Sequence, residues 1–121
     1  MKREYPRTRR ITHRSDFEKL LNQGTRVRTL DLDVRGLASP ARFMRIGLVV
    51  PKGGRTAVAR NKLKRRIREL VRLELLPLNA RCDAVIRCRL TAYERSFEEL
   101  ALQIKEVGAA LMRIFEAKPE A

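Results

Sequence analysis

The stretch RIGLVVPKGGRTAVARNKLKRRIREL, residues 45–70, contains the pattern that decides the fold, because its hydrophobic period changes part-way along. Arg42 to Val50 is predicted to be extended, since its apolar residues alternate with others as on a strand with one buried face. Pro51-Lys52-Gly53-Gly54 then has the composition of a turn. From about Ala57 to Leu76 the spacing becomes helical, and one face of this helix is apolar: Leu63, Ile67, Leu70 and Val71. We therefore expect a strand, a tight turn and a helix whose apolar face packs on the core.

Two predicted elements precede this stretch. A short helix begins at Ser15, which forms a capping box with Glu18, and Gly24 ends the helix in a left-handed conformation. Arg26 to Leu37 is extended, and a break near Thr29 allows this region to be two strands. The residues expected on its buried face are Leu30, Leu32 and Val34, and those expected on its polar face are Asp31, Asp33 and Arg35.

A further strand, Cys82 to Leu90, and a long amphipathic helix that starts with the capping box of Ser96 and Glu99 complete the pattern. The order helix, strand, strand, helix, strand, helix predicts an α+β fold, an α/β sandwich in which one small sheet is packed with helices. The expected divisions of the chain are a basic flexible arm at 1–14, a single domain at 15–116 and a tail at 117–121.

The two cysteines, Cys82 and Cys88, lie six residues apart and so share one strand face. We expect two reduced, half-buried thiols. A zinc site is the less favoured alternative, because His13 is the only histidine and further ligands would be needed. A disulfide is also less favoured, because neighbours on one strand face rarely meet its geometry.

Positive charge is concentrated in the middle of the chain. The chain has 28 Lys and Arg residues against 14 Asp and Glu, a net charge of +14. Lys52 to Arg72 holds nine basic residues and one acid, whereas Thr91 to Ala121 holds four basic residues and six acids. Like charges that crowd one helix face destabilise it unless an anion neutralises them, so this helix predicts a polynucleotide partner.

Other partners are less compatible with the sequence. No apolar run reaches the roughly 18 residues that a membrane-spanning helix needs, and the basic first residues lack a following apolar segment of the secretory type. We therefore expect a cytoplasmic protein with no membrane partner and no small-molecule substrate. The single histidine and the scattered acids give no acid–base or metal constellation, so we expect no catalytic residue in this chain.

The motif Arg60-Asn61-Lys62, on a helix that follows a strand and a lysine-containing loop, resembles the signature of the bacterial ribonuclease P protein component. The resemblance extends from about Arg9 to Met112. Lys62 stands where the family has a second Arg, which keeps the charge but loses the planar fork of a guanidinium. Two further departures are the loop Lys52-Gly53-Gly54-Arg55 and Leu21, where many members have a second aromatic residue.

The resemblance implies an endoribonuclease subunit whose RNA partner carries the chemistry. That RNA removes the 5′ leader of precursor tRNA with Mg²⁺ bound mainly by the RNA itself, and the protein holds the leader and supports the RNA. The positions implied for the RNA subunit are Lys52, Arg55, Arg60, Asn61, Lys62, Lys64, Arg65, Arg68 and Arg72. The positions implied for the leader are Phe17, Leu21, Asp33, Arg35 and Arg89.

Several alternatives stay open at this point. Phe17 can stack on an unpaired base or pack in the core, and Arg35 and Arg89 can bind phosphate or be ordinary surface charges. Asp31 and Asp33 can hold a hydrated Mg²⁺ or, more often, pair with Arg28 or Arg35. The alternative functions are a structural RNA-binding protein of the ribosomal type and a DNA-binding regulator that places the Arg60 helix in a major groove.

Overall fold

The computed structural model describes residues 5–39 and 43–115. Ten elements follow one another along the chain: a 3₁₀ turn η1 (Arg7–Arg9), α1 (Arg14–Gln23), β1 (Thr25–Arg28), β2 (Leu32–Ala38), β3 (Arg45–Val49), α2 (Ala57–Leu70), a π-helical turn η2 (Val71–Leu75), β4 (Cys82–Cys88), a 3₁₀ segment η3 (Leu90–Glu94) and α3 (Phe97–Phe115). The expected α+β order is confirmed, including the break near Thr29 that separates β1 from β2. No helix of the described ranges is long and apolar enough to cross a membrane.

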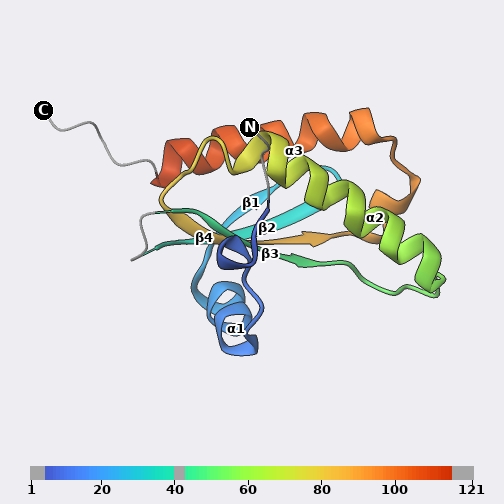
Figure 1. The fold of residues 1–121 in the computed structure, drawn as a ribbon, viewed down its shortest axis with the longest axis horizontal. Helices are drawn as coiled ribbons and strands as arrows, with labels where there is room; N and C mark the ends of the chain where they lie inside the picture. Colours follow the sequence, from blue (N-terminus) through green and yellow to red (C-terminus); the bar gives the residue numbers. More distant parts are fainter. Residues whose placement is uncertain (1–4, 40–42, 116–121) are drawn as a thin grey trace, which may run out of the picture.

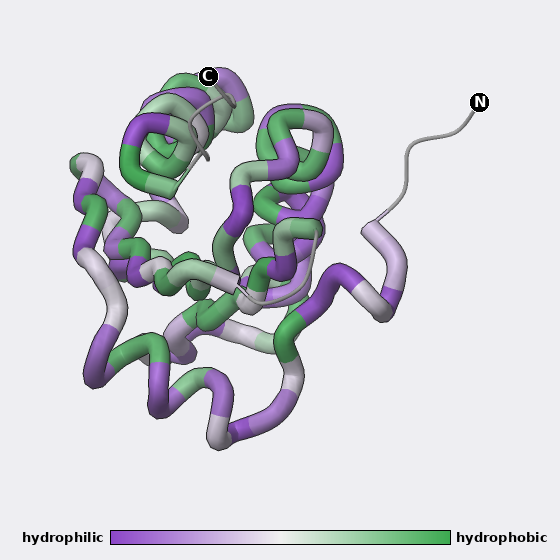
Figure 2. The backbone as a smooth tube through the Cα atoms, turned by 90° about the vertical axis from the view of Figure 1, so that its left-hand side faces the viewer, coloured by the Kyte–Doolittle hydropathy of each residue, from purple (hydrophilic) through white to green (hydrophobic). Residues whose placement is uncertain are grey.

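The four strands form one mixed sheet in the order β1-β2-β4-β3. β1 pairs with β2 and β2 with β4 in antiparallel fashion, whereas β3 lies parallel to β4. α2 and α3 cover one face of the sheet, and α1 crosses the other (Figure 1). Hydrophobic and hydrophilic residues alternate within the turns of the helices, as expected for helices with one buried face (Figure 2).

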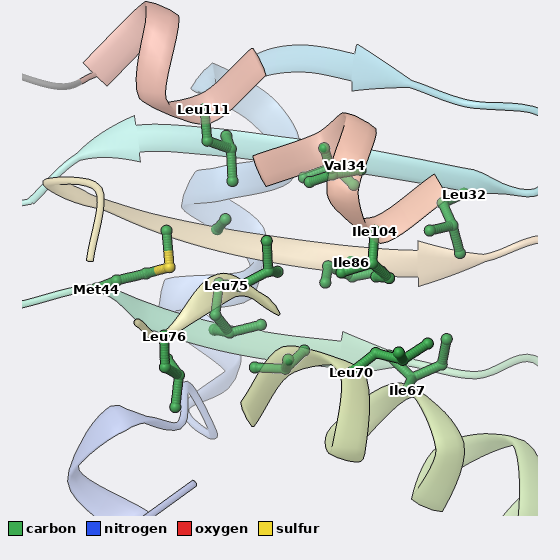
Figure 3. Close-up of a cluster of buried hydrophobic side chains, with 14 of the residues drawn as sticks. Leu32, Val34, Met44, Ile67, Leu70, Leu75, Leu76, Ile86, Ile104 and Leu111 are labelled. Atoms are coloured by element: carbon green, nitrogen blue, oxygen red, sulfur yellow. The ribbon is translucent and has the colours of Figure 1, made fainter. Parts of the chain in front are cut away.

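The main core fills the space between the sheet and the α2–α3 layer (Figure 3). Alternate strand residues such as Leu32, Val34 and Ile86 point into it and are fully buried. A second, smaller cluster lies under α1, where Leu20 packs with Ile11 and Val85. The sheet is thus buried on both faces, but the α1 face only in part.

Three local expectations were wrong. α1 begins at Arg14 with His13 before it, so Ser15 lies inside the helix and caps nothing. Gly24 is extended, at φ −72°, rather than left-handed. A Cβ at that position would lie 2.4 Å from the Leu20 carbonyl oxygen and 3.0 Å from the Arg35 Cβ of β2, so glycine is needed where the chain leaves α1 beside β2. Leu30 is 67% exposed because it lies in the turn between β1 and β2.

The flexible arm is also corrected, for the residues that the structure describes. Tyr5 and Ile11 are buried, and Arg10 forms a parallel bridge with Ile46. The Tyr5 hydroxyl donates to the Ile46 carbonyl, and the Arg9 Nε donates to the Met44 carbonyl at 2.6 Å. Residues 5–13 therefore cover the outer edge of β3. The expected tail, and the first four residues of the arm, lie outside the described residues.

Two other expectations can be followed in the structure. The capping box of α3 is confirmed, since the Ser96 amide donates to the Glu99 carboxylate at 2.8 Å and the Glu99 amide to the Ser96 hydroxyl at 3.0 Å. Cys82 and Cys88 are free thiols in the core, more deeply buried than expected, and burial raises the pKa of each thiol to about 12. Both thiols are therefore protonated at neutral pH.

Candidate nucleic-acid interface

The sheet face under α1 carries a row of arginines that the strand register brings together. Arg26 lies opposite Arg35 across β1 and β2, and Arg28 lies opposite Asp33. Asp33 in turn lies opposite Arg87 on β4. These positions alternate with core residues along their strands, so their side chains point away from α2 and α3. Four guanidinium groups against one carboxylate give this surface, called the sheet surface below, a net charge of +3.

Asp33 is fixed within the sheet surface by Arg26. The Arg26 Nε and Nη2 donate to the two carboxylate oxygens at 3.1 Å and 2.9 Å. Partial burial would raise the pKa of Asp33, but the hydrogen bonds and charge of Arg26, with the nearby Arg35 and Arg28, hold the pKa below its usual value. The carboxylate therefore stays ionised and aligns Arg26, which leaves Arg28 and Arg87 as exposed cations on either side.

α1 forms the wall of the sheet surface. Phe17 is half-buried, and its ring lies directly over Gly47, where a Cβ would come within 2.8 Å of the ring. Leu21 is also half-buried and packs with the Leu20 cluster. The Arg35 Nη1 donates to the Leu21 carbonyl at 3.0 Å, so Arg35 ties the end of α1 to the sheet. Phe17 thus packs against the core while one part of its ring remains accessible.

A cavity of about 240 Å³ connects this wall to α2. Phe17, Ile46 and Leu48 line its apolar side, whereas Lys64 and Arg68 of α2 and Arg10 of the N-terminal segment supply positive charge. An aromatic ring beside several cations is the combination that binds single-stranded nucleic acid, by stacking on bases and by neutralising phosphates. Phe17 of α1 therefore lies at one side of the cavity, and Lys64 and Arg68 of α2 lie at the other.

The basic face of α2 is rigidly presented. Thr56 caps the helix, its hydroxyl accepting from the Ala59 amide at 3.1 Å, and Leu63, Ile67 and Leu70 bury the opposite face. On the outer side are the exposed residues Asn61, Lys62, Arg65 and Arg68 and the half-buried Arg60 and Lys64. We call these six residues the helix surface.

Known proteins resemble this chain over most of its length. The family model that matches, Ribonuclease P, covers residues 5–112. This chain belongs to the ribonuclease P protein family. It is 33% identical over 103 residues to the ribonuclease P protein component of a Picosynechococcus species, covering 84% of this chain and 89% of that protein. To the protein component of Lactobacillus helveticus it is 32% identical over 114 residues, 92% of each chain.

Solved structures of ribonuclease P proteins share the fold. The Staphylococcus aureus protein superposes with a TM-score of 0.68 at 26% identity, over 88% of this chain and 94% of that one. The Thermotoga maritima protein has the same fold, with a TM-score of 0.63 at 24% identity, over 92% and 98% of the two chains. The chain is thus a protein component of ribonuclease P and takes part in tRNA processing.

Most residues implied by the family pattern lie on these two surfaces. Phe17, Leu21, Asp33 and Arg35 come together at α1 and the sheet surface, and six of the nine expected RNA-subunit positions form the helix surface. Of the other three, Lys52 is exposed in the loop before α2. Arg55 and Arg72 instead form ion pairs, the first with Glu94 at 3.0 Å and the second with Glu69.

Arg89 lies just beyond β4, and its amide donates to the Asp31 carbonyl at 2.8 Å. Arg26 and Arg87 were not among the predicted site residues, and Arg28 was expected only as a partner of Asp31 or Asp33. Arg87 has the same strand phase as Arg89, so the period-2 pattern already contained the signal for it. Arg26 and Arg28 could not be placed without the register of β1 against β2.

The expected polar pair of Asp31 and Asp33 is corrected. Asp31 is fully buried on the other side of the sheet, where it accepts from Thr91 Oγ1, Arg95 Nε and Gln103 Nε2 at 2.5–2.6 Å. Strand alternation does not apply to Asp31 because it lies in the turn before β2. Within residues 5–39 and 43–115, no three His, Cys, Asp or Glu side chains come together as a metal site would require.

Proposed function

We propose that this chain binds the catalytic RNA of ribonuclease P through the helix surface and the 5′ leader of precursor tRNA through the sheet surface. The observation that supports this most strongly is the cavity at which Phe17 meets Lys64 and Arg68. Phe17 belongs to α1, the wall of the sheet surface, and Lys64 and Arg68 belong to the helix surface, so a strand that runs past Phe17 can reach both surfaces. The protein can therefore hold the leader beside the RNA subunit, which cleaves it.

Each surface has the chemistry for its assigned ligand. The sheet surface presents the exposed cations Arg28 and Arg87. The half-buried Phe17 of its α1 wall lines the cavity beside α2, and cations together with an accessible ring suit an unpaired strand whose bases can stack. The helix surface offers exposed cations on a convex helix, which suits the phosphates of a folded RNA. Asn61 adds an amide that can both donate to and accept from RNA groups.

We assign the chemistry and its Mg²⁺ to the RNA partner. Mg²⁺ prefers several carboxylate or phosphate oxygens, and the two aspartates first considered for it are held by Arg95 and Arg26. Within residues 5–39 and 43–115, the acidic side chains do not gather into a magnesium centre. What this chain supplies is electrostatic positioning of two RNAs, and we expect this to take place in the cytoplasm.

The direct test combines the protein with a bacterial ribonuclease P RNA and a precursor tRNA at low Mg²⁺. We expect leader removal to be faster than with the RNA alone, because the protein neutralises phosphates that Mg²⁺ would otherwise screen. We also expect the protein to favour a substrate with a leader over one whose leader is cut to one nucleotide. Equal rates with and without protein would contradict the proposed function.

A further inference from the structure

The loop before α2 and the segment after β4 leave the sheet at the same end. β3 and β4 are parallel neighbours, so residues 50–56, which follow β3, and η3, which follows β4, emerge side by side (Figure 1). The first of these segments leads directly into the helix surface. The second leads into α3 and carries none of the residues assigned above to RNA.

Three side chains of η3 hold this loop at three successive points. The Tyr93 hydroxyl donates to the Pro51 carbonyl at 2.6 Å. Leu90 lies against Gly53, which has φ +49° and where a Cβ would lie 2.1 Å from a Leu90 methyl carbon. Arg55 donates to Glu94 at 3.0 Å, and its guanidinium lies 4.6 Å from the centre of the Tyr93 ring. Contacts with η3 therefore hold the loop at Pro51, Gly53 and Arg55.

η3 can act as a fixed support because its own ends are anchored in the interior. The buried Asp31 carboxylate accepts from Thr91 and Arg95, and the Asp31 carbonyl accepts from the Arg89 amide. On the other side, the Arg66 guanidinium of α2 reaches the Arg95 carbonyl at 3.4 Å. The chain of contacts thus runs from the core through η3 to the loop and to α2.

We propose that Tyr93 and Glu94 are positioning residues that set the geometry of the loop and of the first turn of α2 for binding to the RNA subunit. In this arrangement Arg55 does not bind RNA but holds the loop through its contacts with Glu94 and Tyr93. These contacts position Lys52 and Arg60 for binding to RNA. The proposal rests on the proposed function, because it concerns how the helix surface meets its RNA.

The first test is Tyr93→Phe, which removes only the hydroxyl that holds Pro51. We expect affinity for the RNA subunit to fall about two- to tenfold. The slope of log affinity against log salt should stay the same, because the protein still neutralises the same number of phosphates. In the free protein, the Arg55 amide, which donates to the Lys52 carbonyl at 2.7 Å, should exchange its hydrogen faster. Unchanged affinity and unchanged exchange would overturn the proposal.

The second test compares Glu94→Gln with Glu98→Gln, an exposed acid four residues further along. Both variants raise the net charge by one, so any general attraction for RNA rises equally. If Glu94 positions the loop through Arg55, the Glu94→Gln protein binds the RNA subunit more weakly than the Glu98→Gln protein. If Arg55 is itself a phosphate ligand that Glu94 restrains, Glu94→Gln binds as tightly or more tightly, and the positioning role is wrong.

These outcomes are separate from failure of the proposed function. A wild-type protein that does not bind ribonuclease P RNA would refute the proposed function whatever the variants do. A wild-type protein that binds and accelerates cleavage, together with Tyr93→Phe and Glu94→Gln proteins that bind like the wild type, would refute only the positioning role.

Discussion

At the residue scale, Asp31 connects three parts of the fold. Its carboxylate is fully buried and accepts from η3, from Arg95 and from Gln103 of α3. Gln103 in turn accepts from the Asp31 amide at 2.8 Å and from the Thr29 hydroxyl at 2.6 Å. A buried carboxylate is stable only when such donors surround it, so this network is the most sensitive polar feature of the interior.

The Asp31→Asn protein tests this network. The substitution keeps the shape but leaves Arg95 without its charge partner, and we expect the free energy of unfolding at neutral pH to fall by about 2–3 kcal/mol. Asp33→Asn is the matched control, because its pair with Arg26 is more exposed and should contribute about 1 kcal/mol or less. Urea unfolding of the three proteins measures both differences, and equal losses would contradict the assignment.

The same carboxylate predicts a dependence on pH. Burial alone would raise the pKa of Asp31, but the bonds from Arg95, Thr91 and Gln103 lower it from the ordinary value of 3.8. The stabilisation is therefore complete above the ordinary value and is lost as the pH falls through the lower pKa of the folded state. The difference in stability between wild type and Asp31→Asn should narrow between about pH 5 and about pH 2. A constant difference over that interval would show that the charge of Asp31 does not matter.

At the element scale, α1 lies against the sheet at a position that only glycine allows. Phe17 occupies the space over Gly47, and Ile11 lies 3.2 Å from where a Cβ would be. α1 is short and has only Leu20 fully buried, so its place depends on this contact and on the bond from Arg35 to Leu21. These contacts, with the packing of Leu20 on Ile11 and Val85, hold the wall of the sheet surface in place.

Gly47→Ala should push the Phe17 ring away from the sheet. We expect a loss of stability of about 1–3 kcal/mol, as in overpacked cores, together with weaker binding of leader-bearing substrate. In a Phe17→Ala background the added methyl has room, so Gly47→Ala should cost clearly less there. A double-mutant cycle by thermal unfolding measures this coupling, and additive effects would mean that Phe17 does not pack on Gly47.

α2 allows a test in which paired and exposed arginines on one helix are compared. Arg65→Ala and Arg68→Ala should each reduce the salt slope of binding to the RNA subunit by roughly 0.7–0.9 for every phosphate that the protein no longer neutralises. Arg72→Ala should change the slope less, because Arg72 is paired with Glu69, whose hydrogen bond raises the pKa of Arg72. Slopes that stay unchanged for Arg65 and Arg68 would place the RNA-binding site elsewhere.

At the scale of the whole molecule, charge is divided between two surfaces on different layers. The helix surface belongs to the α2–α3 layer, and the sheet surface lies on the opposite face of the sheet, beside α1 (Figure 1). The cavity that Phe17 lines with Lys64 and Arg68 lies between α1 and α2. The proposed function assigns one RNA to each surface, and the arginines that define the sheet surface are different residues from those of the helix surface.

This division predicts that the two binding functions can be separated. Arg87→Ala should weaken binding of leader-bearing substrate to the assembled enzyme and leave the affinity for the RNA subunit unchanged. Arg65→Ala should do the reverse. The control for loss of one positive charge is Arg81→Ala, because Arg81 is an exposed arginine directly before the first residue of β4. If both variants weaken both affinities equally, the protein has one continuous RNA surface rather than two.

The amino-acid sequence by itself determined the order of the elements, the two-faced character of α2 and the capping box of α3. These features depend on residues one to four positions apart, so hydrophobic period and local hydrogen bonding are enough to predict them. For the same reason, it was predictable that Arg60, Asn61 and Lys62 lie on a helix that follows a strand. The basic character of the helix surface, to which they belong, was predictable as well.

Only the tertiary structure decided which distant residues meet. The strand register placed Arg26, Arg28 and Arg87 around Asp33. Packing buried Asp31 in the interior, where it accepts a hydrogen bond from Arg95, 64 positions away in the sequence. Burial of Tyr5 and Ile11 likewise fixed a segment that looks like a disordered basic arm. Period-based reasoning says which face of an element is apolar, but pairing between elements depends on how those faces pack, and that is a property of the whole chain.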